Sequence, residues 1–394
     1  MAKLLISCDD YIFRHRGRYY FKNREWADFY QRYLRVFDAL RIVNRCIDEE
    51  ELKPGRIAAD DPRIEIRPLP IFHGPAQYLT RYAATGRAMR GAVEGCDAAL
   101  LRLPSTVAQR LSRQVLRKGI PYAVEVVFDA CDGAETASNP AEKLLWRIID
   151  RQMRRICAGA DGVSCVTEHY LQRRYFSVRP GHFESHYSTL ALDRSFFSAP
   201  RKYPARRPMR IAHVDMQLSL HGRKGTDIIL QALAELKRRG IVVEVRFAGD
   251  DWDHSTERIA AYARKLGIGG QVSFPGFLSR QQLNDFLDDS DLFVLPTKAE
   301  GLPRVIIEAM AKALPTVTTP ASGNPELIPE HYLVGFSDVA ALAERIEELT
   351  ENPEAYERAS AENFENSLQY EASILQERRD GFYRSLLQKT VNRK

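Results

Sequence analysis

The sequence predicts an α/β protein with two Rossmann-like domains, each built on a parallel sheet covered by helices. Short apolar segments alternate with amphipathic segments along most of the chain, which is typical of alternating strands and helices. The length of 394 residues suits two domains of about 190 residues each better than one. Residues 177–208 interrupt the alternation with four prolines and clustered basic residues, which predicts a linker.

The expected elements follow this alternation on each side of the linker. In the first domain, residues 1–200, we expect strands near residues 3–8, 39–45, 63–69, 97–103, 121–128 and 161–167, and helices near 25–36, 76–93, 105–118, 140–158 and 168–175. In the second domain, residues 206–366, we expect strands near 209–214, 241–248, 271–274, 291–296, 315–319 and 332–336, and helices near 225–239, 255–266, 280–288, 303–313, 338–350 and 354–366. A last helix is expected near 370–389, within a C-terminal segment of residues 367–394.

Composition predicts a folded cytoplasmic protein. With 44% hydrophobic residues the chain can bury full cores. It has no run of 18 uncharged apolar residues, and its first ten residues contain two acids, so we expect neither a transmembrane helix nor a secretory signal. All six cysteines lie in the first half without a Cys-x-x-Cys pair, which favours reduced thiols over disulfides or zinc.

Basic residues concentrate in the first half of the chain. The net charge is +7 for residues 1–200 and −2 for residues 201–394. Arginines cluster at residues 14–18, 151–155 and 173–174, either as solvated helix faces or as sites that attract anionic lipid headgroups or a phosphate-bearing acceptor. Aromatic residues interleave with basic ones over residues 18–26, which permits docking on a membrane surface or stacking on sugars. We expect no nucleic-acid partner, because no recognition motif is present.

The most informative segment is residues 300–328, which begins with two carboxylates eight positions apart, Glu300 and Glu308. Gly301 allows close backbone approach, Pro303 suits a first helical turn, and the N–H groups of that turn can bind a diphosphate. Glu308 would lie roughly 7 Å further along the helix, near a ribose attached to that diphosphate. Glu300 would face a sugar on the distal phosphate. Alternatively, Arg304 and Glu308 form only a surface ion pair.

A second motif, Lys224-Gly-Thr-Asp227, lies between the first strand and first helix of the second domain. The Lys224 ammonium can neutralise charge on a departing diphosphate, although a lone loop lysine is more often merely solvated. Both motifs closely resemble those of retaining, nucleotide-sugar-dependent glycosyltransferases of GT-B fold, particularly family 4 with its Glu-x7-Glu signature. The match is good over residues 205–350, whereas residues 1–200 match the family mainly in their alternation of strands and helices.

The resemblance implies two Rossmann-like domains facing each other across a cleft, with the donor on the second domain and the acceptor on the first. It implies a C-terminal helix that crosses back to the first domain, retention of anomeric configuration, and no cofactor besides the nucleotide-sugar co-substrate. It implies catalytic roles for Glu300 and Lys224. The donor-binding residues expected are Glu308, Gly301, Leu302, Pro303, Arg304, Arg223, Phe277, Leu278 and Gly17. On the acceptor side we expect Asp129, Arg16 and Arg18, although surface carboxylates are the default interpretation of Asp129.

One feature departs from the family pattern. The family usually carries Val-Gly-Arg after the first donor-domain strand, whereas this chain has His213-Val-Asp-Met-Gln217. Arg223 or an arginine of the first domain could supply the missing cation. The departure leaves two alternatives open: a nucleotide-sugar-binding protein that does not transfer or needs a partner, and a GT-B-fold sugar-nucleotide epimerase. We find no Gly-x-Ser-x-Gly, Walker or His-Glu-x-x-His motif, and no Asp-x-Asp metal motif, so no metal is expected.

Overall fold

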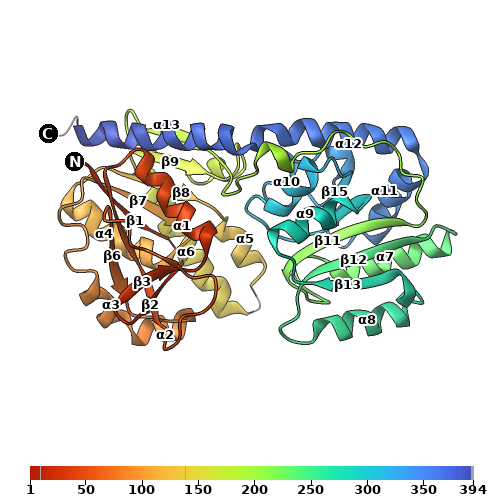
Figure 1. Cartoon of the computed structure of the whole chain (residues 1–394), viewed down its shortest axis with the longest axis horizontal. Coiled ribbons are helices and arrows are strands. Elements are labelled where there is room, and N and C mark those ends of the chain that lie inside the picture. Colours follow the sequence, from red (N-terminus) through yellow and green to blue (C-terminus); the bar gives the residue numbers. More distant parts are fainter. Residues whose placement is uncertain (9, 138, 392–394) are drawn as a thin grey trace. The chain divides into compact units, whose positions relative to one another are not determined.

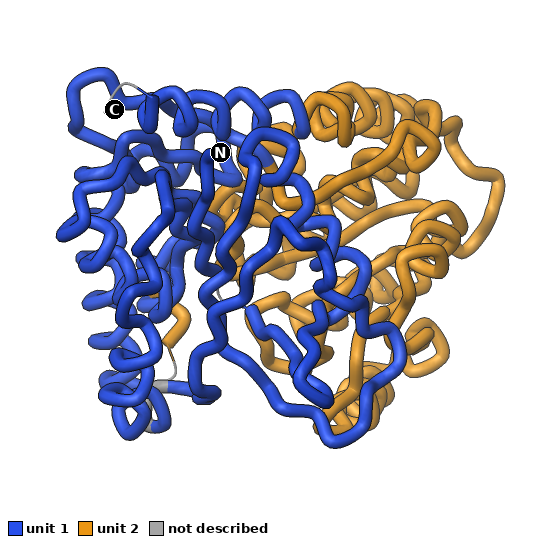
Figure 2. Tube along the Cα trace, turned by 60° about the vertical axis from the view of Figure 1, so that its left-hand side comes forward, with its two compact units in different colours: residues 1–134, 139–187, 376–394 blue, residues 135–138, 188–375 orange. Residues whose placement is uncertain are grey.

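The computed structural model describes residues 1–8, 10–137 and 139–391. The chain divides into two units, which Figure 2 shows in different colours. Unit 1 contains residues 1–134, 139–187 and 376–394, and unit 2 contains residues 135–138 and 188–375. The predicted α/β class is confirmed in both units (Figure 1).

Unit 1 is built on a sheet whose main strands are parallel. These strands are β1 (Lys3–Ser7), β4 (Ala39–Asp48), β6 (Ile64–Leu69), β7 (Ala98–Leu103), β8 (Tyr122–Val126), β9 (Gly162–Cys165) and β10 (Phe183–His186). The order is β10-β9-β8-β7-β1-β4-β2-β3-β5, with β6 beside β4. Leu4, Leu5 and Ile6 are fully buried in β1, as expected for a parallel strand covered on both faces. The strand β10 lies inside the segment expected to be a linker.

A hairpin that the sequence reading did not anticipate extends this sheet. Strands β2 (Tyr11–His15) and β3 (Arg18–Phe21) pair antiparallel, and β5 (Ile57–Ala58) follows β3. Arg16 and Gly17 form the turn with φ of 46° and 79°, the left-handed pair that fits the twist of a two-residue hairpin. Tyr20 and Phe21 are buried in the core. The interpretation of these two aromatic residues as membrane-docking or sugar-stacking groups was therefore wrong.

Six helices of unit 1 are described, and side chains cap three of them, α1, α4 and α6. The six helices are α1 (Arg24–Gln31), α2 (Gly74–Thr80), α3 (Tyr82–Ala88), α4 (Thr106–Lys118), α5 (Ala130–Glu135) and α6 (Pro140–Ala158). The Ser105 side chain accepts from the Ala108 N–H to cap α4, and Asn139 accepts from the Glu142 N–H to cap α6. The helix expected over 76–93 is two short helices that break at Arg81. The helix expected over 168–175 is only a 3-10 turn, Leu171–Arg173.

The last helix, α13 (Ala372–Val391), begins in unit 2 and continues into unit 1 from Gln376. Its Tyr383 hydroxyl donates to Glu125 Oε1 at 2.9 Å. The buried Glu125 also accepts from the Tyr187 hydroxyl at 2.8 Å and forms an ion pair with Arg102 at 3.3 Å. These contacts fix the second part of α13 to the strand β8 within unit 1.

Unit 2 has five parallel strands in the order β13-β12-β11-β14-β15. The strands are β11 (Met209–Gln217), β12 (Val243–Asp250), β13 (Val272–Gly276), β14 (Leu292–Leu295) and β15 (Thr316–Thr318). The helices are α7 (Thr226–Arg238), α8 (Ser255–Lys265), α9 (Arg280–Asp288), α10 (Arg304–Ala311), α11 (Val339–Glu351) and α12 (Pro353–Ser367). The strand expected over 332–336 is reduced to one bridge between Thr318 and Leu333.

The strand order of unit 2 locates its natural ligand site. The chain passes from β11 outward to β12 and β13, then returns to place β14 on the other side of β11. In such sheets ligands bind beyond the carboxyl ends of the strands where the order reverses, here between β11 and β14. Within the ranges described above, no helix is long and apolar enough to cross a membrane.

Candidate functional site

The loop after β11 presents Lys224 at the point where the strand order reverses. Gly225 caps α7 in the left-handed conformation, with φ of 68°. A Cβ at this position would lie 2.3 Å from the Pro296 carbonyl oxygen, so no other residue fits without a shift of the backbone. The Lys298 N–H, in the loop after β14, donates to the Arg223 carbonyl at 2.8 Å. The two loops are thus held against each other.

Glu300 lies in the loop after β14 and forms an ion pair with Lys224, Nζ to Oε1. Both residues are buried, with 9% of Glu300 and 8% of Lys224 exposed. The Thr297 hydroxyl lies 3.3 Å from the same carboxylate oxygen. The sequence indicated both residues but not that they contact each other. A phosphate bound here would contact the Lys224 ammonium, whose positive charge the Glu300 carboxylate already partly neutralises.

The helix α10 begins directly after this loop. Pro303 is its N-cap residue, and its carbonyl accepts from the Ile306 N–H at 3.1 Å. The positive end of the helix dipole and the N–H groups at the start of a helix attract anions, so this end of α10 can receive one. Gly301, Leu302 and Pro303 are buried, whereas Arg304 is exposed. Glu308 lies one turn further along and is half-buried.

A third loop, after β15, supports the second one. The Glu300 N–H donates to Ser322 Oγ at 3.1 Å, and Ser322 has a left-handed φ of 51°. The buried Asn324 amide donates to Thr318 Oγ1 and to the Thr319 carbonyl, both at 3.0 Å. Ser322 and Asn324 lie within the informative segment 300–328, but neither was predicted as a site residue. The sequence feature that could have indicated them is their position in the loop that follows β15, the last strand of unit 2.

Two ionisable side chains near the end of β11 complete the surroundings of Lys224. His213 is fully buried, its Nδ1 lies 3.0 Å from the Val294 carbonyl, and burial lowers its pKa to about 4. His213 is therefore neutral at pH 7. Burial raises the pKa of the Asp215 carboxyl, while the positive charges of Lys224 and Arg223 oppose that shift. The segment His213–Gln217 thus holds a carboxyl group, Asp215, and no arginine.

The remaining donor-side residues expected in unit 2 lie further along the same sheet edge. Phe277 and Leu278 follow β13, and β12 separates that strand from β11. Phe277 is 68% exposed, so its ring is available to a ligand. Arg223 is exposed and makes no ion pair with the described residues. No cluster of three or more His, Cys, Asp or Glu side chains in those same residues could hold a metal ion.

The residues expected in unit 1 fall into two separate places. Arg16, Gly17 and Arg18 form the β2–β3 turn, where Arg18 pairs with Asp60. Asp129 follows β8, and strands β7, β1 and β4 lie between β8 and β2 in the sheet. The structure therefore does not bring Arg16–Arg18 and Asp129 together within this unit.

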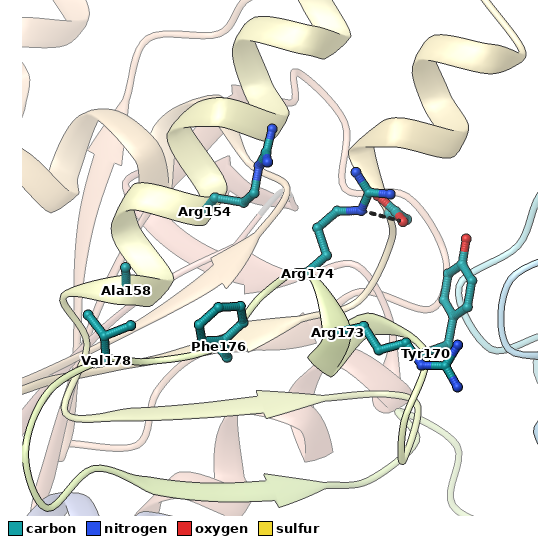
Figure 3. Close-up of a pocket in the computed structure, with 8 residues that line it drawn as sticks. Arg154, Ala158, Tyr170, Arg173, Arg174, Phe176 and Val178 are labelled. Atoms are coloured by element: carbon teal, nitrogen blue, oxygen red, sulfur yellow. Dashed lines mark ion pairs between the residues drawn. The ribbon is translucent and has the colours of Figure 1, made fainter.

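Asp129 lies at a basic cavity of about 490 Å³ (Figure 3). It is only 2% exposed, so the interpretation of Asp129 as a surface carboxylate was wrong. Its Oδ2 pairs with Arg174 Nε at 3.4 Å, and its Oδ1 lies 2.8 Å from the Tyr175 hydroxyl. The lining residues are Asp129, Arg154, Ala158, Tyr170, Arg173, Arg174, Phe176 and Val178. Figure 3 shows the apolar members at one end and Tyr170 with Arg173 at the other.

Comparison with known proteins agrees with this geometry. Residues 218–365, which contain Lys224, Glu300 and Glu308, match the family model of glycosyl transferases group 1. Sucrose-phosphate synthase from Thermosynechococcus elongatus has a similar structure over 98% of this chain and all of its own, with a TM-score of 0.70 at 17% identity. The chain has the GT-B fold, in which residues 218–365 match the group 1 domain.

Other similar proteins match different parts of the chain. Protein CapJ from Staphylococcus aureus is 22% identical over 96% of this chain and 94% of its own. The amylovoran biosynthesis glycosyltransferase AmsK from Erwinia amylovora is 31% identical, over only 34% of each chain. HepE from Anabaena, solved in complex with UDP and glucose, superposes over the full length of both chains with a TM-score of 0.66 at 14% identity.

Proposed function

We propose that this protein is a glycosyltransferase that moves a sugar from a nucleoside-diphosphate sugar to a hydroxyl acceptor, with retention of anomeric configuration. The observation that carries the proposal is the contact of Lys224 with Glu300 where the strand order of unit 2 reverses. A cation for phosphate, a carboxylate for sugar hydroxyls and a helix N-terminus lie within two adjoining loops. That set of groups fits a sugar joined to a diphosphate.

Each group has one task in the proposed complex. The N–H groups of the first turn of α10 bind the diphosphate, and Glu308, one turn further on, holds the ribose hydroxyls. Lys224 turns from Glu300 toward the phosphates and neutralises the charge that grows as the sugar–oxygen bond breaks. Glu300, released from its ion pair, accepts hydrogen bonds from the hydroxyls of the transferred sugar.

Retention requires the acceptor hydroxyl to attack on the face from which the diphosphate leaves. In the proposed step the acceptor oxygen bonds to the anomeric carbon as the bond to the phosphate oxygen breaks, and the departing phosphate takes the hydroxyl proton. The reaction then needs positioned cations rather than a side-chain base. Lys224 and the exposed Arg223 are the cations that unit 2 offers near this point, and no metal ion is required.

The relatives suggest the biological product. AmsK is named for amylovoran biosynthesis, and HepE was solved with UDP-glucose as well as with UDP. We propose that this protein acts in the cytoplasm and builds a bacterial surface polysaccharide or a lipid-linked glycan. The acceptor is assigned to unit 1, whose cavity beside Asp129 offers arginines and aromatic rings.

A second candidate function is donor binding without transfer, either alone or until a partner binds. The segment His213-Val-Asp-Met-Gln217 favours it, because it lacks the arginine that would help Lys224 to neutralise a departing diphosphate. Incubation with a panel of nucleotide-sugars, with and without a lipid-linked acceptor, separates the two functions. Acceptor-dependent release of UDP or GDP by the wild type, and its loss in Lys224→Ala and Glu300→Ala, is expected. Full turnover by both folded variants would show that the site is elsewhere.

A further inference from the structure

The outer face of α6 carries a row of cations that the fold itself does not explain. Lys143, Arg147, Arg151 and Arg155 follow one another at intervals of four residues, and all four are exposed. None of them forms an ion pair within the described part of the chain. Like charges at this spacing lie side by side on a helix and destabilise it. An anionic partner outside this chain would remove that repulsion.

Large apolar side chains lie among these cations. Leu144 is 59% exposed and Ile148 is 46% exposed. At 3.6 residues per turn, the arc from Lys143 to Ile148 covers about 140° of the helix surface. We call Lys143, Leu144, Arg147, Ile148, Arg151 and Arg155 the α6 face.

The basic–apolar character continues past the end of the helix. Val178 donates its N–H to the Ala158 carbonyl at 3.1 Å, which brings the segment after β9 against the last residue of α6. Val178 is 67% exposed and Phe176 is 47% exposed, and both line the cavity with Arg154 and Arg173 (Figure 3). The α6 face thus adjoins a second group of exposed apolar and basic side chains.

The opposite side of α6 already provides the packing that unit 1 needs. Met153, Ile156 and Cys157 are buried there, and the buried Asp150 pairs with Arg154 at 2.6 Å. The exposed apolar residues of the α6 face therefore add nothing to the core.

We propose that the α6 face docks on the surface of an anionic lipid bilayer, with α6 lying in the plane of the interface. The cations reach the headgroup phosphates, while Leu144 and Ile148 enter the boundary with the acyl chains. A soluble polyanion would satisfy the charges but leave these apolar side chains in water. The inference does not depend on which donor unit 2 binds, so it can fail while the proposed transfer reaction holds.

Co-sedimentation of the full chain with vesicles tests the proposal. The wild type is expected to bind vesicles that contain phosphatidylglycerol, to bind phosphatidylcholine vesicles weakly, and to lose binding as salt is raised. Each basic side chain near an anionic surface contributes roughly a fivefold change in partition, so the triple variant Arg147→Gln/Arg151→Gln/Arg155→Gln should bind about 100-fold more weakly. Glutamine keeps the helix propensity of these positions.

This triple variant and a second variant, which removes the apolar side chains, each have a matched control. Arg238→Gln/Arg264→Gln/Lys265→Gln removes the same charge from the last turns of α7 and α8 in unit 2, and should bind vesicles almost as the wild type does. Leu144→Ser/Ile148→Ser should weaken binding about tenfold. Its control, Leu79→Ser/Val242→Ser, changes exposed apolar residues outside α6 and should leave vesicle binding unchanged.

Melting points and circular dichroism verify that every variant is folded. Equal binding to neutral and anionic vesicles would overturn the proposal, as would an α6 triple variant that binds as well as its charge-matched control. Binding to soluble polyphosphate without binding to vesicles would also overturn it.

Discussion

Replacing Lys224 by methionine removes the ammonium group from the proposed donor site but keeps a side chain of similar length. In the ligand-free protein this leaves the Glu300 carboxylate, which is 9% exposed, without its charged partner. Breaking a fully buried ion pair costs about 3–5 kcal/mol. Partial exposure and the hydrogen bond from Thr297 reduce this cost, so we expect unit 2 to lose about 2 kcal/mol of stability.

The same variant should bind nucleoside diphosphates more weakly. One charge-assisted hydrogen bond is worth about 1.5–3 kcal/mol, which corresponds to roughly a 10- to 150-fold rise in Kd. Glu300→Gln should behave in the opposite way toward the nucleotide. It also loses the ion pair, but it frees the ammonium, so UDP or GDP should bind at least as tightly as to the wild type while sugar transfer falls.

Isothermal titration calorimetry with UDP and GDP, together with urea unfolding, measures both effects. Lys298→Met is the matched control, because Lys298 lies in the same loop and is exposed, with its ammonium 4.8 Å from the centroid of the Phe336 ring. The control should keep both stability and affinity. A folded Lys224→Met protein with unchanged nucleotide affinity would refute the proposed role of Lys224, and weaker binding only by the Lys298→Met control would assign that role to Lys298 instead.

Three further predictions concern the same unit. Gly225→Ala should destabilise unit 2 by about 2 kcal/mol or more, because its Cβ would meet the Pro296 carbonyl in a left-handed backbone; a urea midpoint equal to the wild type contradicts this. The pKa of His213 is about 4 in the folded protein and 6.5 in the unfolded chain. As the pH falls from 7 to 4, the unfolded chain takes up this proton before the folded protein does, so the free energy of unfolding should fall by up to about 3 kcal/mol. Urea unfolding across this range should show less dependence on pH in His213→Asn. Sugar transfer should be unchanged by EDTA, and a loss that added Mg²⁺ restores would disprove metal independence.

The sequence predicted unit 2 better than unit 1 for physical reasons. In unit 2 each of the strands β11 to β14 is followed by a helix, so the alternation is clear. In unit 1 the β2–β3 hairpin consists of short strands rich in arginine and tyrosine, and the basic residues obscured the alternation of apolar and polar positions. The turn residue Gly17 between Phe13 and Tyr20 was the available signal for a hairpin. Strand β10, with the sequence Phe-Glu-Ser-His, has too little apolar character to be found by periodicity.

Prediction of the candidate site from the sequence was limited in a similar way. The sequence placed Lys224 and Glu300 in loops after two different strands, but their contact depends on β11 and β14 being neighbours in the sheet. Strand order follows from how the helices pack, which periodicity does not reveal. Likewise, nothing local distinguishes Asp129 as buried, because its partner Arg174 lies 45 positions later in the chain.

The path of α13 has a consequence for how the protein is made. Tyr383, Phe382 and Leu386 fill the core of unit 1, yet they follow the whole of unit 2 in the chain. Unit 2 is synthesised before that segment and can finish folding first. Unit 1 therefore keeps an open core until α13 has been made, and a truncation before Gln376 removes the side chains that fill it.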